Sequence, residues 1–187
     1  MKEAPVAVAP VRNGRGLIAV KSVQSGATIL RVHGRIVHYE LLWRRQGSKF
    51  AANCFRYGPD TYLDPGDGVA RFVNHSCEPN AGIRKVNNQL FLFAARKIGR
   101  GAEITIDYST TIGDDDIWRM RCNCGRRSCR KVVRNFGSLP AAVRERYLSR
   151  GLVPGYIIRT LADGAPAVRW NRVSGRQSRF NAASRSS

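Results

Sequence analysis

The stretch that decides the fold is Arg71–Asn80, RFVNHSCEPN, near the middle of a chain of 187 residues. Within it, His75 and Cys77 are two residues apart, so their side chains share one face of an extended backbone. A cysteine beside a histidine is the arrangement of a nucleophile and its base. No residue that would orient the histidine can be placed from the sequence. The tetrapeptide Asn74–Cys77 alone therefore leaves the chemistry open.

A second motif is the cysteine cluster Cys122-Asn-Cys124-Gly-Arg-Arg-Ser-Cys129, with the spacing C-x-C-x4-C. Zinc prefers four thiolate or imidazole ligands in a tetrahedron, so three local cysteines need a fourth ligand from elsewhere. The candidates are Cys54, Cys77, His33, His38 and His75. We expect the neighbouring arginines to lower the pKa values of the thiols; these are Arg121, Arg126, Arg127 and Arg130. An iron–sulfur cluster or unrelated reduced thiols are the less favoured alternatives.

Short apolar runs separated by turn residues predict a mainly β fold, of the α+β class, with a C-terminal helix. Strands are expected at 17–20, 27–37, 61–63, 82–86, 89–94 and 103–107, with a hairpin turn at the paired asparagines 87–88. A short helix is expected over 39–47. A stronger helix signal follows the cysteine cluster, with Ser138 as its cap, Pro140 in its first turn and Gly151 as its end.

Four motifs occur in one order along the chain: Gly14-Arg-Gly16, RFVNHSCEPN, Gly101-Ala-Glu-Ile-Thr-Ile-Asp-Tyr108 and C-x-C-x4-C. Together they resemble the SET-domain family of protein-lysine methyltransferases, whose signatures are G-x-G, RF-x-NHSC-x-PN, GEEL-T-x-DY and a cysteine-rich post-SET segment. The resemblance covers about residues 11–135. It implies a fold of several small β-sheets around a knot-like C-terminal segment.

The resemblance implies S-adenosylmethionine as the cofactor, bound by Gly14, Arg15, Gly16, Arg71, Asn74, His75 and Tyr108. The two glycines would let the backbone approach the cofactor closely, since neither has a Cβ atom. Asn74 would bind its amino-acid end, and His75 would meet its adenine mainly through the backbone. Tyr108 is the catalytic residue that the resemblance implies, where it would orient the reacting groups and stabilise changing charge rather than act as the base.

Family members with a post-SET segment join the cysteine of NHSC to the three later cysteines on one zinc ion. The resemblance thus implies one structural zinc ion held by Cys77, Cys122, Cys124 and Cys129. Such an ion would fold the C-terminal segment over the active site. The chain departs from the family at Ile106, where members commonly carry Phe or Tyr and where the side chain influences how many methyl groups fit.

The resemblance and the changes in composition predict five segments. Residues 1–10 are expected to be a flexible leader, 11–113 the SET domain and 114–135 the post-SET zinc segment. A C-terminal helical extension is expected over 136–165, and a basic, disordered tail over 166–187.

The formal net charge of +19 would attract nucleic acid, an anionic surface or an acidic protein, unless it is only a solvated basic surface. No apolar run approaches the ~20 residues that span a bilayer, and the N-terminus is too weak for a secretory signal. We therefore expect an intracellular enzyme, in the cytoplasm or the nucleus, that methylates lysines of a histone or another protein associated with nucleic acid. The alternative is a catalytically inactive basic zinc module that binds nucleic acid or an acidic protein.

Overall fold

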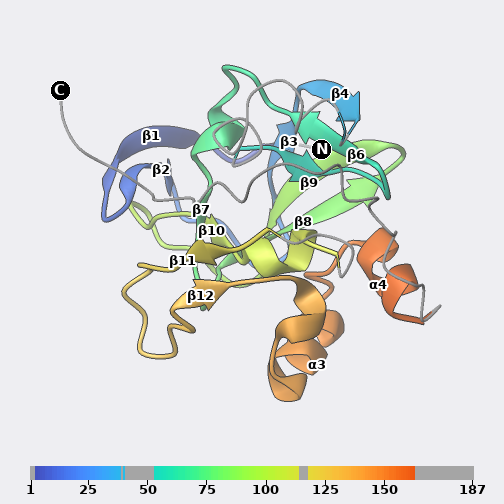
Figure 1. The fold of residues 1–187 in the computed structure, drawn as a ribbon. Helices are drawn as coiled ribbons and strands as arrows, with labels where there is room; N and C mark the ends of the chain where they lie inside the picture. The colour runs from blue at the N-terminus through green and yellow to red at the C-terminus, as the bar shows by residue number, and fades with distance from the viewer. Residues whose placement is uncertain (1–2, 39, 41–52, 114–117, 163–187) are drawn as a thin grey trace, which may run out of the picture.

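The computed structural model describes residues 3–38, 40, 53–113 and 118–162, and within them small β-sheets precede the helices (Figure 1). The strands are β1 Val6–Val11, β2 Gly14–Ala19, β3 Thr28–Val32, β4 Arg35–His38, β5 Phe55–Arg56, β6 Thr61–Asp64, β7 Asn74–His75, β8 Ala81–Val86, β9 Gln89–Ala94, β10 Thr105–Ile106, β11 Met120–Arg121 and β12 Val132–Val133. Short 3-10 helices are η1 Val69–Phe72, η2 Tyr108–Thr111 and η3 Phe136–Ser138, and the α-helices are α3 Ala141–Ser149 and α4 Gly155–Ala162.

The strands form separate sheets of two or three members. Hairpins join β1 to β2 and β11 to β12, and the three-stranded sheets have the orders β3-β9-β8 and β4-β6-β5. The turn between β8 and β9 contains Asn87 and Asn88 at φ of 47° and 58°, which short polar side chains tolerate best. The predicted mainly β fold of small sheets, and this hairpin turn, are confirmed.

The main hydrophobic core lies beneath β2, β3, β8 and β9. It contains Leu17, Ile29, Leu90 and Leu92, none of which is exposed to solvent. Ile106 of β10 belongs to the same core and is 2% exposed. Packing of Ile106 in this core thus fixes the position of β10, the strand that leads into Tyr108.

The prediction of a flexible leader over residues 1–10 is wrong for its second half, because residues 6–11 form β1. Val6 pairs with Ala19 at one end of the β1–β2 hairpin, and Val11 pairs with Gly14 at the other. Pro10 would disfavour a central strand, but β1 pairs only with β2 in its sheet, and proline is tolerated on an edge strand. The hairpin lies beside the site described below.

The C-terminal helix is confirmed, and its capping is not as predicted. The residue before α3 is Pro140, and the hydroxyl-bearing Ser138 instead ends η3, where its N–H donates to Asn135 Oδ1 at 3.0 Å. Gly151 follows the helix at φ +62°, as its role as the helix end requires. In Figure 1, α3 lies below and to the right of the small β11–β12 sheet, and α4 lies to the right of α3.

The predicted disordered tail over 166–187 lies outside the described residues. The predicted helix over 39–47 also lies outside them, except for Glu40. Among the described residues, no helix is long and apolar enough to cross a membrane.

Candidate active site and metal centre

Two of the motifs are brought side by side by the parallel pairing of β7 and β10. Asn74 lies opposite Thr105, and His75 lies opposite Ile106. The chain continues on each side of this pairing, since the N–H of Ser76 donates to the carbonyl oxygen of Ile106 at 2.9 Å. The NHSC and ITIDY segments, which are distant in the sequence, therefore meet where Tyr108 begins η2.

Tyr108 is held at both its backbone and its hydroxyl. Its hydroxyl donates to the carbonyl oxygen of Val73 at 2.8 Å, and its N–H donates to Nδ1 of His75 at 3.2 Å. Its ring centroid lies 5.4 Å from that of His75 and 6.3 Å from that of Trp118. Burial, with a smaller contribution from Glu103, strongly raises the pKa of Tyr108. The phenol therefore stays protonated near neutral pH and is fixed as a hydrogen-bond donor.

The glycine motif forms the turn and the start of β2 beside Asn74. Gly14 has φ +88°, which favours glycine, and a Cβ on Gly16 would lie 2.7 Å from both Glu103 Oε1 and Val11 Cγ2. The side-chain amide of Asn74 donates to the carbonyl oxygen of Arg15 at 3.1 Å and to Glu103 Oε1 at 2.8 Å. Glu103, which was not predicted as a site residue, thus links the glycine turn to NHSC.

The two arginines predicted for this site lie near one aromatic ring. The guanidinium carbon of Arg15 is 4.5 Å from the ring centroid of Phe72, and that of Arg71 is 5.4 Å from it. Arg71 also pairs with the exposed Asp67, its Nη1 lying 3.0 Å from Oδ1. The predicted set of Gly14, Arg15, Gly16, Arg71, Asn74, His75 and Tyr108 is therefore assembled from β2, η1, β7 and η2 around one location.

His75 is buried and neutral. Desolvation lowers its pKa to about 4, although the charge of Asp107 acts in the opposite direction. Because Nδ1 accepts the N–H of Tyr108, the ring proton is placed on Nε2, which lies 3.4 Å from the sulfur of Cys77. His75 is therefore neutral, is 6% exposed, and contacts both Cys77 and Tyr108. The pair is not set up as a nucleophile with its base.

Asp107 is a second residue of this site, after Glu103, that was not predicted from the sequence. Its side chain is fully buried and accepts hydrogen bonds from Arg130 Nη2, at 2.8 Å to Oδ1 and 2.6 Å to Oδ2. Oδ1 also accepts the N–H of Ser109 at 3.0 Å, and Oδ2 the hydroxyl of Tyr147 at 2.9 Å. Burial alone would lower the pKa of Arg130, but the attraction of Asp107 raises it. One carboxylate thus joins Tyr108's turn, the cysteine segment and α3.

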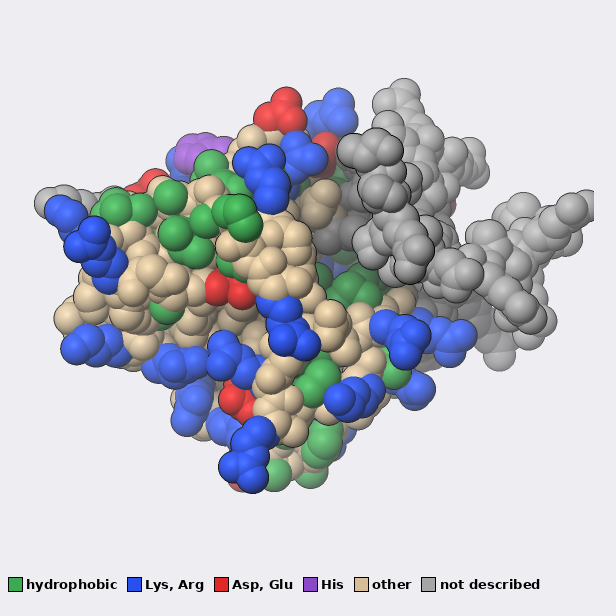
Figure 2. Space-filling view, turned by 90° about the vertical axis from the view of Figure 1, so that its left-hand side faces the viewer, with side chains coloured by type: hydrophobic (Ala, Val, Ile, Leu, Met, Phe, Trp, Pro, Cys, Tyr) green, Lys and Arg blue, Asp and Glu red, His purple; other side chains and the backbone are tan. Residues whose placement is uncertain are grey.

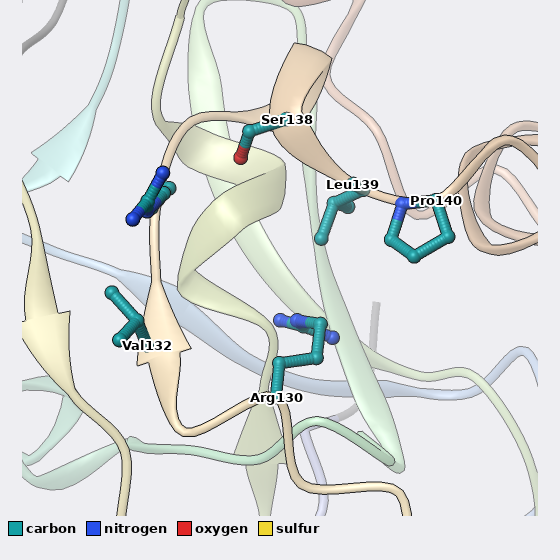
Figure 3. Close-up of a pocket in the computed structure, with 6 residues that line it drawn as sticks. Arg130, Val132, Ser138, Leu139 and Pro140 are labelled. Carbon is teal, nitrogen blue, oxygen red and sulfur yellow. The ribbon is translucent and has the colours of Figure 1, made fainter.

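A cavity of about 330 Å³ lies beside this ion pair, between β12 and the start of α3. It is lined by Arg130, Val132, Arg134, Ser138, Leu139 and Pro140. Figure 3 shows the side chain of Arg130 extending into the space below Leu139. Arg130 thus reaches from its own loop, along one side of this cavity, to the buried carboxylate of Asp107, and its side chain is 16% exposed.

The metal ligands named from the resemblance come together in space. The sulfur atoms of Cys77, Cys122, Cys124 and Cys129 all lie within 4.8 Å of one another, and those of Cys77 and Cys122 are 3.7 Å apart. Four sulfurs on a tetrahedral zinc ion with Zn–S bonds of ~2.3 Å would be ~3.8 Å apart. The donor set and its spacing therefore fit one zinc ion. Of the other candidate ligands, Cys54 packs elsewhere, near Val37 and Tyr62.

The arginine charges do not set the thiol pKa values as expected: the pKa values of Cys77 and Cys122 are raised, and that of Cys124 is lowered by hydrogen bonds. Burial raises the pKa of Cys77 to about 11 and raises that of Cys122 further, and Arg130 does not reverse this for Cys77. For Cys124, burial also acts upward, but backbone hydrogen bonds lower its pKa to about 7. Buried thiols with raised pKa values ionise only when a cation compensates them, which a divalent metal ion would do.

The comparison with known proteins agrees with this geometry. A family model of the SET domain matches residues 14–109, so the chain belongs to the SET domain family. Human histone-lysine N-methyltransferase 2B is 32% identical over 131 residues, which are 65% of this chain and 5% of that protein. The histone-lysine N-methyltransferase, H3 lysine-4 specific, of Mycosarcoma maydis is 30% identical over 144 residues, 71% of this chain and 10% of that protein.

A solved structure gives the same result for the fold. The methyltransferase domain of human histone-lysine N-methyltransferase SETMAR superposes with a TM-score of 0.60 at 25% sequence identity, covering 71% of this chain and 59% of that one. The chain spans only 5% and 10% of the lengths of the two curated relatives named above. The similarity therefore concerns the domain that carries the site.

Proposed function

We propose that the protein is an S-adenosylmethionine-dependent methyltransferase that transfers methyl groups to the side-chain amine of a lysine in a protein. S-adenosylmethionine would supply an electrophilic methyl group, which the neutral lysine amine takes as the carbon–sulfur bond breaks. The cofactor-binding residues proposed are those gathered around Asn74: the turn Gly14–Gly16, Arg71, His75 and Tyr108. Their common location on β2, η1, β7 and η2 supports this assignment.

The observation that carries the proposal is the state of Tyr108. Its phenol is neutral, and its oxygen is fixed by the donated bond to the Val73 carbonyl, so its lone pairs face outward from that bond. A fixed, uncharged oxygen can orient an amine and stabilise charge without removing a proton itself. The lysine proton would be lost by desolvation, since burial disfavours the charged ammonium. Aligning the two reactants would lower the barrier further.

Cofactor binding and transfer test this function separately. We expect calorimetry to give saturable binding of S-adenosylmethionine to the zinc-loaded protein. We also expect radiolabelled S-adenosylmethionine to label lysines of core histones or another lysine-rich protein, and Tyr108→Phe to abolish the label while cofactor binding persists. If Tyr108→Phe labels as well as the wild type, the catalytic assignment is wrong.

The zinc ion proposed at Cys77, Cys122, Cys124 and Cys129 is structural. All four sulfur donors belong to the protein, which leaves no open position for a substrate. The backbone N–H of Arg130 lies 3.4 Å from the sulfur of Cys77 and would stabilise its thiolate when the metal is bound. The ion would tie the proposed post-SET segment, residues 114–135, to the proposed SET domain, residues 11–113.

The names of the relatives favour a histone as the substrate, and we propose a lysine-containing protein of that basic, nucleic-acid-associated kind. We also propose an intracellular location, in the cytoplasm or with chromatin in the nucleus, which is supported by the names of the relatives and by a cysteine cluster spaced for a metal ion. The remaining divisions proposed are a helical extension over residues 136–165 and a basic tail over 166–187.

A second candidate function, contact with nucleic acid, is favoured by the charge of the post-SET segment. After Asp114, Asp115 and Asp116 at its start, this segment contains no Asp or Glu and carries Arg119, Arg121, Arg126, Arg127, Arg130, Lys131 and Arg134. On the face drawn in Figure 2, Lys and Arg side chains are spread widely, with few acidic ones among them. Binding of a DNA duplex should weaken steeply with salt, and Arg126→Gln with Arg127→Gln should reduce the salt slope by about 1 for each phosphate that is no longer neutralised. Salt-independent binding would count against this role.

A further inference from the structure

The C-terminal extension, here residues 136–162, is joined to the rest of the protein by two buried tyrosine hydroxyls. The hydroxyl of Tyr156 in α4 donates to the carbonyl oxygen of Arg56 in β5 at 2.7 Å. The hydroxyl of Tyr147 in α3 donates to Asp107 Oδ2 at 2.9 Å, with the Cys77 carbonyl oxygen 3.2 Å away as a second acceptor. Both tyrosines belong to one apolar cluster and are at most 5% exposed. The two hydroxyls therefore bind different parts of the protein. Of the two, Tyr147 reaches the candidate active site and Tyr156 reaches β5.

The hydrogen bond from Tyr147 restrains the Asp107 carboxylate in a direction in which the contact with Arg130 does not. The hydroxyl of Tyr147 donates to Oδ2, the oxygen that the N–H of Ser109 does not reach. Arg130 contacts both carboxylate oxygens through the single nitrogen Nη2, rather than through a two-nitrogen fork. A contact through one nitrogen leaves the carboxylate plane able to turn about that point. The hydroxyl of Tyr147 on Oδ2, together with the N–H of Ser109 on Oδ1, fixes the plane of the carboxylate.

The orientation of this carboxylate determines how the next residue is held. Asp107 is the N-cap of η2, and its Oδ1 accepts the N–H of Ser109 at 3.0 Å. A side-chain cap fixes the first turn of the helix that it precedes. Tyr108 is the first residue of that turn, and its carbonyl oxygen accepts the hydroxyl of Thr111 at 3.0 Å. A turned carboxylate would therefore release the cap and displace the ring of Tyr108.

We propose that Tyr147 is a positioning residue, whose hydroxyl orients the Asp107 carboxylate so that the capped turn presents Tyr108 in its working position. The inference rests on the proposed function, because that function makes Tyr108 the catalytic residue. A displacement of ~1 Å in such a site can lower the rate about a hundredfold. The C-terminal extension, although it lies outside the matched SET domain of residues 14–109, thereby becomes part of the active site.

Tyr147→Phe and its matched control Tyr156→Phe test the proposal. Each variant removes one buried hydroxyl from the same apolar cluster and keeps its ring. In protein labelled with [ε-13C]tyrosine, Tyr108 is assigned from Tyr108→Phe. Its resonance senses small movements because the rings of His75 and Trp118 lie 5.4 Å and 6.3 Å away. We expect this resonance to shift or broaden in Tyr147→Phe and to keep its position in Tyr156→Phe.

Kinetics with labelled S-adenosylmethionine and core histones give the second readout. We expect kcat to fall about ten- to a hundredfold in Tyr147→Phe, with the KM for S-adenosylmethionine within about twofold of the wild type, and Tyr156→Phe to keep wild-type kcat. A Tyr108 resonance that does not move in folded Tyr147→Phe, or moves equally in both variants, overturns the proposal. If the wild type methylates nothing, the proposed function fails, and the spectra still decide whether Tyr147 positions Tyr108.

A measurement on the wild type covers the case in which Tyr147→Phe does not fold. A hydroxyl donated to a buried carboxylate exchanges slowly with water, so the Tyr147 hydroxyl proton should give its own resonance at low temperature. Fast exchange of that proton would contradict the contact on which the inference depends.

Discussion

Replacing Arg130 with methionine would leave the carboxylate of Asp107 buried without its cationic partner. In the native protein, Arg130 Nη2 lies 2.8 Å and 2.6 Å from the two carboxylate oxygens, and the Asp107 side chain is 0% exposed. Removing one partner of a buried ion pair costs about 3–5 kcal/mol, because the other charge stays uncompensated. Ser109 and Tyr147 still donate to Asp107, and the Arg130 side chain is 16% exposed. We therefore expect the lower end, a loss of about 3 kcal/mol.

Urea unfolding at a fixed free-zinc concentration measures this loss, with Arg134→Met as the matched control. Arg134 lines the same cavity but is exposed, so its replacement should change the free energy of unfolding by about 0.5 kcal/mol or less. Arg130→Met keeps the backbone N–H that faces the sulfur of Cys77, so the zinc content should not change. Equal losses in both variants, or a loss below about 1 kcal/mol for Arg130→Met, would refute the reasoning.

The other predictions concern the cofactor, the metal and the thiol of Cys54. Gly16→Ala should weaken S-adenosylmethionine binding at least about tenfold in calorimetry, because its Cβ has no room; unchanged affinity would place the cofactor elsewhere. Cys77→Ser should lower the zinc content below one ion per chain by mass spectrometry of the metal, and full retention would assign another fourth ligand. In the zinc-loaded protein, iodoacetamide should react slowly with Cys54 at pH 8, since burial and then Asp64 raise its pKa to about 12 and keep it a thiol. A chelator should add four reactive thiols, and rapid labelling before the chelator is added would contradict this.

Much of the site follows from residue types and spacing alone. The short apolar runs and the paired asparagines predict β8, β9 and their turn, because strand and turn preferences are local. The C-x-C-x4-C spacing predicts a metal site because three soft ligands so close together have few other uses. The fourth ligand could not be chosen from spacing. The family resemblance indicated Cys77, and the folded chain places its sulfur among the other three.

The sequence by itself determined the family, the mainly β fold and the residues proposed for the cofactor and the metal, since these depend on short motifs that occur in one order. Only the tertiary structure decided what surrounds them. Helical spacing places Val143 and Tyr147 on one helix face, but no local rule says that the Tyr147 hydroxyl meets Asp107 across forty residues of sequence. Val6, Val8 and Val11 favour a strand but Pro10 opposes one, so only the pairing with β2 shows that residues 6–11 form β1. A buried polar group must find a donor wherever packing brings one, and that partner is fixed by the whole fold.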